Sequence, residues 1–470
     1  MDESRRLERL SQLDLSNLRI EDHGLPMHVA ALMFLDQAGP SAELDLDTLR
    51  AAVARRLQRV PRLRQILQRP PVGLGPPLWI DDPGFDIREH VRLHVVPAPG
   101  DEPAVLTVCT ELNAAPLDRA RPLWEIWLLT GLAGGGSGLL IRLHHAVADG
   151  LAAVAMMEGL FAPDPEDPNP DVSTWRRQPR PSTRELVADS LHRRISATAG
   201  VLVQMRHPSA IIARLRLLAG SARTLAQAGQ APRVSINVPV SGHHRLMLVR
   251  ADLGRVRKVA HAHGGTVNDV VLSAVAGGAQ RLLDARGELT PGLVLRASVP
   301  ASLRSPSGNV AAGNRVGVMI VPLRLGDADP ASRLSLIAAT TAARKRQPLH
   351  QPNTRLLQRW MVRMMKRQHL VNLIVSNVPG PRIPLYVAGV KITEIFQIGA
   401  VQGNVTISVG AFSYASRLNL DVVGDPDALP DLTIFTGGVA DTLGRLGALA
   451  GSQPSQATAR QGPGSRRGPQ

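Results

Sequence analysis

Cysteine is almost absent from this 470-residue chain. Its single residue, Cys109, cannot form an intrachain disulfide, which fits a reducing compartment. No apolar stretch reaches the roughly 18 uninterrupted residues that a membrane-spanning helix needs. The polar start, residues 1–6, is not followed by the apolar region of a signal peptide. We therefore expect a cytoplasmic protein.

Aromatic residues and lysines are also scarce. Aromatic side chains make up 3% of the chain, which is few for a surface that stacks nucleic-acid bases. Only four of the 54 basic residues are lysines, although the formal net charge is +15. Such one-sided use of arginine indicates a bias of the genome at least as much as a binding face, and no nucleic-acid-binding module is recognisable. We expect the charge to face the phosphates of a ligand or an anionic membrane, not nucleic acid.

The most informative segment is residues 144–150, which read His-His-Ala-Val-Ala-Asp-Gly. The apolar run 138–143 predicts a buried strand before it, and residues 151–160 predict a helix after it. Imidazole titrates near neutrality, so a histidine at a strand end can take a proton from an alcohol and return it to a leaving group. The carboxylate of Asp149 would stabilise the turn that presents the imidazole.

Two other interpretations compete for this segment. Asp149 could act only as the N-cap of the following helix, and short motifs often match by chance. A metal site is disfavoured because adjacent histidines of a strand point to opposite faces, so His144 and His145 cannot readily share an ion. The complete string, placed between a strand and a helix, favours a general base over both alternatives.

The length of the chain exceeds what one hydrophobic core holds and indicates two domains. We place the first domain at residues 1–162 and the second at residues 233–450. Between them, residues 163–232 combine a proline-rich linker with an arginine-rich helical segment, and residues 451–470 are expected to form a disordered tail.

Within the first domain, residues 27–35 alternate as a half-buried strand does. Asp47 is expected to cap a helix that carries Leu49, Val53 and Leu57 on its apolar face.

Several other segments allow weaker predictions. Residues 355–367 form a basic amphipathic pattern, which could lie on an anionic membrane or pack its apolar face on the second domain. A second histidine pair, His243-His244, lacks a downstream Asp-Gly and is expected in a surface turn. The glycine-rich residues 131–138 lack the Gly-Lys-Ser/Thr of a phosphate loop and are expected to form a turn. Cys109 follows a strand-like stretch and is expected to be a core residue, not a nucleophile.

The string His-His-x-x-x-Asp-Gly is the signature of the CoA-dependent acyltransferase superfamily, which includes chloramphenicol acetyltransferase and the condensation domains of peptide synthetases. Four further segments occur in order, namely Pro26 to Val29, Pro122 to Trp124, Thr266 to Leu272 and Ser376 to Pro381. Together with the signature, they make the chain resemble the bacterial wax ester synthase/diacylglycerol acyltransferase family over residues 10–445.

This resemblance implies an α/β fold of two chloramphenicol-acetyltransferase-like domains, each a mixed sheet flanked by helices, with the active site in the channel between them. It implies an enzyme that transfers a fatty acyl group from acyl-CoA to the hydroxyl of diacylglycerol or a long-chain alcohol, without an acyl-enzyme. Acyl-CoA would be a co-substrate, and no bound cofactor or metal is expected. The enzyme would meet its lipid substrate as a peripheral protein on an anionic membrane or lipid droplet.

The resemblance also assigns roles to the residues of the signature. His145 corresponds to the general base and His144 to a structural residue. Asp149 corresponds to a carboxylate that pairs with an arginine, for which Arg64 is our candidate; a simply solvated Arg64 is the alternative. Gly150 lets the backbone pass close to the substrate and leaves an N–H group at the start of the helix.

Other candidates lie along the implied channel. Asn268 could donate a hydrogen bond to the oxyanion or position the acyl chain, although Asn268 and Asp269 could instead only cap a helix. Pro122 and Trp124 are expected to shape the channel. Two alternative functions stay open at this point, an acyltransferase of the same superfamily with another hydroxyl or amine acceptor, and a non-catalytic lipid-droplet protein that retains the fold.

Overall fold

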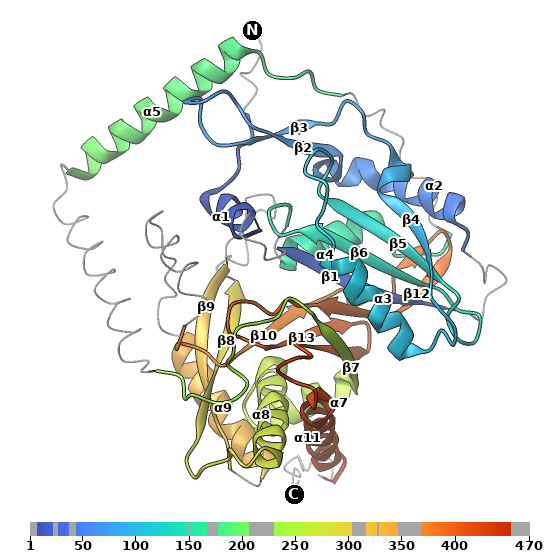
Figure 1. The fold of residues 1–470 in the computed structure, drawn as a ribbon, viewed down its shortest axis with the longest axis vertical. Helices are drawn as coiled ribbons and strands as arrows, with labels where there is room; N and C mark the ends of the chain where they lie inside the picture. Colours follow the sequence, from blue (N-terminus) through green and yellow to red (C-terminus); the bar gives the residue numbers. More distant parts are fainter. Residues whose placement is uncertain are drawn as a thin grey trace, which may run out of the picture.

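The computed structural model has a mixed α/β fold, as expected from the sequence. It describes residues 7–21, 27–36, 44–148, 150–166, 177–205, 230–302, 316–326, 329–345 and 368–452. These residues form two six-stranded sheets and one two-stranded sheet, with helices packed around them (Figure 1). Residues 206–229 of the expected arginine-rich helical segment, the amphipathic pattern at 355–367 and the tail beyond residue 452 lie outside the described residues.

The first sheet runs in the order β11-β12-β1-β6-β5-β4. Its strands are β1 (His28–Leu35), β4 (Val91–Val95), β5 (Trp124–Thr130), β6 (Gly138–His144), β11 (Tyr386–Val387) and β12 (Val390–Ile398). Neighbouring strands are antiparallel except β4 and β5. Two of the six strands, β11 and β12, come from the range that we expected to form the second domain.

The elements around this sheet come mainly from the first half of the chain. The helices are α1 (Gln12–Glu21), α2 (Leu46–Arg56), α3 (Glu102–Ala114), α4 (Gly150–Leu160) and α5 (Thr183–Met205). Short 3-10 helices span Leu57–Arg59, Pro61–Arg64 and Ile87–Glu89, and a small hairpin joins β2 (Gln65–Gln68) to β3 (Leu78–Asp81). The expected strand at 138–143 and helix at 151–160 are therefore confirmed as β6 and α4.

Strand β1 confirms the expected strand at residues 27–35 but not its half-buried character. Leu32 and Met33 are consecutive and therefore point to opposite faces, yet both are fully buried. Met33 belongs to an apolar cluster that includes side chains of α2 and α4, whereas Leu32 belongs to a separate cluster with side chains of α3. Both of its faces are covered.

Two local predictions are wrong. Helix α2 is capped by Asp45, whose carboxylate accepts a hydrogen bond from the Thr48 backbone at 2.8 Å, whereas Asp47 lies in the first turn. Cys109 lies in helix α3 and does not follow a strand, because Asp101 caps this segment at the Ala104 backbone N–H. The expected burial of Leu49, Val53, Leu57 and Cys109 is confirmed.

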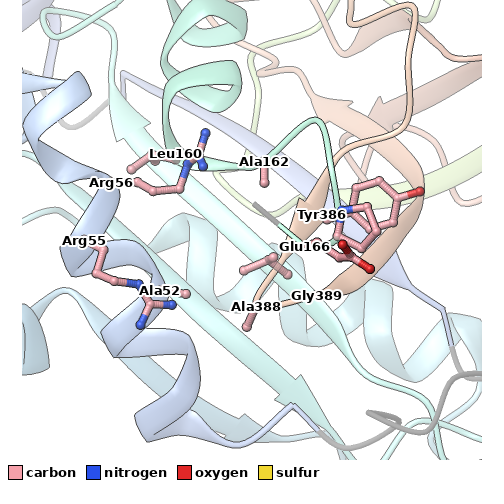
Figure 2. A pocket seen from close by; sticks show the side chains of 11 residues that line it. Ala52, Arg55, Arg56, Leu160, Ala162, Glu166, Tyr386, Ala388 and Gly389 are labelled. Atoms are coloured by element: carbon pink, nitrogen blue, oxygen red, sulfur yellow. The ribbon is translucent and has the colours of Figure 1, made fainter. Parts of the chain in front are cut away.

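A cavity of about 160 Å³ lies at the outer edge of the first sheet, between α2, the end of α4 and β11 (Figure 2). Arg55 and Arg56 of α2 reach it from one side, and Tyr386 and Glu166 from the other. Arg56 is anchored there, because its Nε donates to the Gly159 carbonyl at 3.1 Å. The cavity therefore borders the end of α4 that is distant from the histidine pair.

The second sheet runs in the order β7-β14-β13-β10-β8-β9. Its strands are β7 (Arg245–Asp252), β8 (Val294–Ser302), β9 (Val316–Arg324), β10 (Leu373–Pro379), β13 (Ile407–Tyr414) and β14 (Arg417–Gly424). Strand β10 is parallel to both of its neighbours. The histidine pair His243-His244 precedes β7 outside regular structure, with His243 exposed, as expected.

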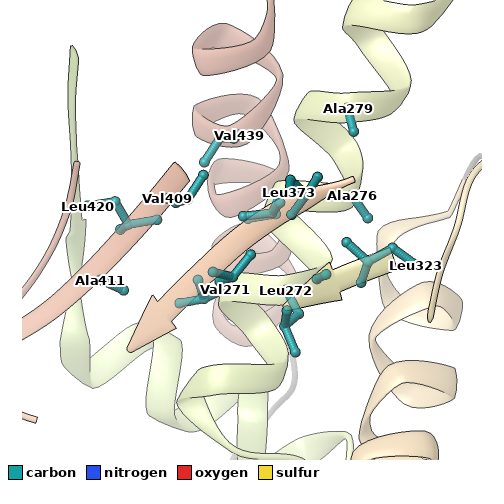
Figure 3. Packing of buried hydrophobic residues seen from close by; sticks show 14 of the residues in the cluster. Val271, Leu272, Ala276, Ala279, Leu323, Leu373, Val409, Ala411, Leu420 and Val439 are labelled. Atoms are coloured by element: carbon teal, nitrogen blue, oxygen red, sulfur yellow. The ribbon is translucent and has the colours of Figure 1, made fainter. Parts of the chain in front are cut away.

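Among the described residues of the second half, the helices are α7 (Leu253–Ala262), α8 (Val267–Ala285), α9 (Pro330–Lys345) and α11 (Leu432–Ser452). Figure 3 shows how α8 and α11 pack on this sheet, with Val271 and Leu272 of α8 close to Leu373 of β10. These side chains are fully buried. A buried apolar core of this size holds β10, and hence the Ser376–Pro381 segment, in a fixed position.

Candidate active site

The histidine pair lies at the end of the fully buried strand β6. The backbone N–H of His144 donates to the Leu123 carbonyl at 3.0 Å, and that of His145 donates to the Met27 carbonyl at 2.8 Å. A further hydrogen bond, from the Val147 N–H to the His144 carbonyl at 2.8 Å, closes the turn that follows. Three of the motif segments that are far apart in the sequence are thus joined by backbone hydrogen bonds.

The ring of His144 is enclosed by the protein and hydrogen-bonded to the backbone, and its structural role stays a prediction. Its side chain is fully buried, and Nδ1 accepts a hydrogen bond from the Ala146 N–H at 2.9 Å. The proton of a neutral ring therefore resides on Nε2. This atom lies 3.3 Å from Glu21 Oε2, without the alignment of a hydrogen bond, and the contact is an ion pair only when the ring is protonated.

Glu21, at the end of α1, is a site residue that we did not expect from the sequence. Its carboxylate contacts three cationic or imidazole groups: His144, His28 Nε2 at 3.1 Å and Arg119 Nη2 at 2.7 Å. Burial alone would raise the pKa of Glu21, but the contacts with His144, His28 and Arg119 hold this pKa well below its usual range. The only signal in the sequence is that Glu21 lies shortly before the segment that begins at Pro26.

His145 is the half-buried member of the pair, in contrast to the fully buried His144. It follows the last residue of β6 and belongs to the turn before α4. Asp149 lies outside the described residues, so its expected pairing with Arg64 stays a prediction. Arg64 itself is half-buried beside Phe85, with its guanidinium 5.9 Å from the ring centre. Burial lowers the pKa of Arg64, and the charge of Asp81 partly opposes this.

Gly150 connects the motif to the second sheet. It is the first residue of α4, and a Cβ atom there would lie 3.1 Å from Cγ2 of Val378, near the end of β10. Gly380 is more tightly constrained, because a Cβ atom there would lie 2.3 Å from Phe412 Cε1. The start of α4 therefore packs against the Ser376–Pro381 segment, where the two halves of the molecule meet.

Pro122 and Trp124 are packed into the first sheet, and their expected role in shaping the channel stays a prediction. Both are buried, and the Trp124 indole donates to the Leu63 carbonyl at 2.7 Å. Its ring stacks on His90 at a centroid distance of 4.6 Å. The pKa of His90 is lowered, and burial is the largest cause. These contacts fix the strand that lies beside the histidine pair.

Asp269 caps α8, which is the alternative that we left open for it. One carboxylate oxygen accepts hydrogen bonds from the N–H and the hydroxyl of Thr266, both at 2.7 Å, and the other accepts from Thr341 Oγ1 at 2.7 Å. With 1% exposure and both oxygens bonded, this carboxylate is structural. Asn268 is half-buried, and its role toward the substrate stays a prediction.

Two further chemistries can be assessed in the described part of the chain. No group of three His, Cys, Asp or Glu side chains there could hold a metal ion. Burial raises the pKa of the Cys109 thiol to about 12, so this thiol is not a thiolate nucleophile at neutral pH. Among the same residues, we find no helix with the length and hydropathy needed to cross a membrane.

Comparison with known proteins identifies the family to which the chain belongs. Residues 10–271 match the family model of the wax ester synthase/diacylglycerol acyltransferase catalytic domain, and residues 312–447 match that of its C-terminal domain. A probable diacylglycerol O-acyltransferase, tgs1 of Mycobacterium tuberculosis, is 29% identical over 97% of this chain and 99% of the relative. A putative diacylglycerol O-acyltransferase of Mycobacterium bovis, Mb3154c, is similar to the same extent.

Solved structures share the fold. The wax ester synthase/diacylglycerol acyltransferase from Marinobacter aquaeolei VT8 superposes with a TM-score of 0.67 at 24% identity, covering 94% of this chain and 100% of that chain. A starter condensation domain of rhizomide synthetase, solved with C8-CoA, gives a TM-score of 0.61 at 15% identity, covering 96% and 97%. With both domain models matched in order, the chain belongs to the wax ester synthase/diacylglycerol acyltransferase family and is an acyltransferase.

Proposed function

We propose that this acyltransferase moves a fatty acyl group from acyl-CoA to the hydroxyl of diacylglycerol or of a long-chain alcohol, forming triacylglycerol or wax ester. The observation that carries the proposal is the half-buried His145, placed in a turn whose neighbours on both sides are fixed by backbone hydrogen bonds. The names of the Mycobacterium relatives support diacylglycerol as the acceptor.

In the proposed reaction, His145 accepts the proton of the acceptor hydroxyl while the hydroxyl oxygen attacks the thioester carbonyl carbon. The tetrahedral intermediate then collapses, the carbon–sulfur bond breaks and the imidazolium returns its proton to the CoA thiolate. Atoms balance without an acyl-enzyme, a metal or a bound cofactor, and acyl-CoA is a co-substrate. Asp149, paired with Arg64, would fix the turn, and Asn268 would line the path of the acyl chain.

The test of this assignment is the variant His145→Ala. Loss of a general base is expected to slow CoA release by about 10²–10⁴-fold while the melting profile stays unchanged. His243→Ala is the matched control, because His243 is an exposed histidine in the other half, 77% accessible at its side chain. Near-wild-type CoA release from a folded His145→Ala protein would contradict the proposal. Absence of CoA release from the wild-type protein would favour a non-catalytic lipid-droplet role.

The acceptor is tested separately, since an apolar pocket discriminates chain length only weakly. One labelled acyl-CoA is offered with diacylglycerol, a long-chain alcohol or an amine, and the products are separated by thin-layer chromatography. We expect ester products only. An amide product would instead place the chain with acyltransferases of the superfamily that use amine acceptors.

A lipid acceptor resides in a membrane or droplet, so we also propose peripheral contact with an anionic lipid surface from the cytoplasmic side. The net charge of +15 supports this, because basic residues near an anionic leaflet each contribute about 1 kcal/mol.

A further inference from the structure

Helix α5 lies at the periphery of the molecule, beside the small β2–β3 hairpin (Figure 1). The face of α5 that carries Leu186 and Asp189 holds the helix in this position. Leu186, 4% exposed, packs with Leu78 and Ile80 of β3 in a small apolar cluster. The carboxylate of Asp189 on the same face pairs with Arg9 Nε at 2.6 Å. This inward face therefore buries only one large aliphatic side chain in the described part of the helix.

The opposite face of α5 carries more apolar side chains than the inward face. Val187, Leu191 and Ile195 are 47%, 57% and 57% exposed. They follow one another at intervals of four residues, so they form one stripe along the helix. A helix of a globular protein normally turns its aliphatic stripe toward the core. Here the stripe points away from it, and none of the described residues covers it.

The charges around this stripe are basic. Arginines 177, 180, 184, 193 and 194 occur in the described residues from 177 to 205 and are exposed. The two acidic residues of this segment are already engaged, Asp189 with Arg9 and Glu185 with the backbone and hydroxyl of Ser182, at 2.6 and 2.7 Å. Within the helix, Arg184 lies three residues before Val187 and Arg194 three residues after Leu191, so these two border the stripe. An aliphatic stripe with basic neighbours matches an anionic lipid surface. The same like charges would repel a second copy of this chain.

We infer that the outward face of α5, defined by Val187, Leu191 and Ile195, docks on an anionic lipid surface. This inference rests on the proposed lipid acceptor and names the part of the molecule that meets it. Arg9 lies in the segment before α1, and its pair with Asp189 links that segment to α5. Its Nη1 also donates to the carbonyl of Pro76 in the β2–β3 hairpin at 2.8 Å. Helix α1 then leads to Glu21 beside His144. The docking face and the histidine pair thus belong to one connected part of the fold.

The experiment is flotation of the full-length protein with vesicles of phosphatidylcholine alone or mixed with phosphatidylglycerol, at low and high salt. The test variant is Val187→Ser/Leu191→Ser/Ile195→Ser. The matched control replaces three exposed aliphatic residues outside α5 by serine, namely Leu93 and Val95 of β4 and Val318 of β9. The binding assay contains no acyl-CoA, so its result does not depend on the proposed reaction.

We expect the α5 variant to lose at least about tenfold in partition onto anionic vesicles, because three aliphatic side chains no longer leave water. The control is expected to stay within about twofold of the wild type, and binding should weaken as salt rises. CoA release with a water-soluble alcohol should be unchanged in both variants, which separates docking from chemistry.

Equal vesicle binding by wild type and α5 variant would overturn the inference, as would equal binding to neutral and anionic vesicles. A wild-type dimer in light scattering that the α5 variant converts to monomer would also overturn it, because the stripe would then be a contact between copies.

Discussion

Glu21 is the residue whose chemistry is most constrained by its neighbours. Its carboxylate is shared by His144, His28 and Arg119, and its side chain is only 10% exposed. Removing one partner of a largely buried ionic group leaves the others without compensation. We interpret Glu21 as a positioning residue, because its carboxylate contacts His144, whose ring is also held by the Ala146 backbone N–H.

The variant Glu21→Gln keeps the shape of the side chain and removes its charge. We expect a loss of about 2–3 kcal/mol in unfolding free energy and a lower kcat with little change in KM. Because the folded-state pKa of Glu21 is depressed below 4.5, its stabilising effect is present above that pH and is lost as pH falls. The difference between wild type and variant in urea denaturation should therefore shrink below about pH 4.

Glu89→Gln is the control for this prediction, since Glu89 forms ion pairs with its side chain 45% exposed. Such pairs contribute about 0–1 kcal/mol. If Glu21→Gln changed stability and rate no more than Glu89→Gln does, the positioning role would be excluded.

Asp421 in β14 contrasts with Glu21, because its pKa is raised and that of Glu21 is lowered. It is fully buried, its Oδ2 accepts a hydrogen bond from the Gly399 N–H at 3.0 Å, and its Oδ1 has no hydrogen-bond partner in the described residues. Burial raises the pKa of Asp421 from 3.8 to about 7. The folded state therefore binds its proton more tightly than the unfolded state does, and stability should fall as pH rises from about 4 to 7.

Asp421→Asn should remove this pH dependence. The variant is expected to match the wild type near pH 4 and to exceed its unfolding free energy at pH 8 by up to about 4 kcal/mol. Urea denaturation at both pH values measures the effect, with the exposed Asp427→Asn as the control. A wild type that gains stability between pH 4 and 7 relative to Asp421→Asn would refute the buried, protonated carboxyl.

At the scale of elements, the start of α4 is the contact that joins the histidine motif to β10. A Cβ atom at Gly150 would lie 3.1 Å from Val378 Cγ2, which is tighter than ordinary packing. Gly150→Ala is expected to lose about 1–2 kcal/mol and part of the activity. The Val378→Ala change should restore much of both, a coupling that a double-mutant cycle measures.

Gly444→Ala is the matched control for Gly150→Ala. Gly444 lies in α11, and a Cβ atom there would meet nothing within 4 Å. This substitution should stabilise the helix by about 1 kcal/mol. Additive effects of Gly150→Ala and Val378→Ala would show that the two elements are not coupled.

Elements with a clear periodic pattern could be predicted from the sequence, whereas pairing between distant segments could not. The strand–turn–helix around His144 follows from local apolar runs and is confirmed. The stretch before Cys109 was misread as a strand because a short apolar run does not distinguish a strand from a helix. Glu21 could not be found, since nothing in one sequence links it to His144, a neighbour only in space.

The same limit applies to the whole molecule. Two domains were expected from the length of the chain. Strand β12 nevertheless pairs with β1, although most of the sequence lies between them, and Ala30 stands opposite Ile398. Alternation of side chains sets which face of β12 is buried but carries no information about which sheet it joins. Its side chains and carbonyls also bind the second sheet, since Asn419 Nδ2 donates to the Ile395 carbonyl at 2.9 Å.

Glu394 of β12 also connects the two sheets, through a carboxylate whose side chain is 12% exposed. It pairs with Arg250 of β7 at 2.9 Å and with Arg417 of β14 at 2.8 Å, and Arg250 reaches on to Glu102 of α3 at 2.6 Å. Burial alone would lower the pKa of Arg250, but its hydrogen bonds to Glu102 and Glu394 raise it. Groups from both halves are thus tied through one ionic cluster.

Because β12 belongs to one sheet and is bonded to the other, the two halves should unfold together. We expect a single calorimetric transition, and Glu394→Gln should lower its midpoint by about 2–5 °C without splitting it. Asp441→Asn, which breaks a pair exposed by more than half on both sides, should leave the midpoint almost unchanged. Two separate transitions in the wild type would mean that the halves fold independently. In that case β12 would only cross between them and would not bind them into one cooperative unit.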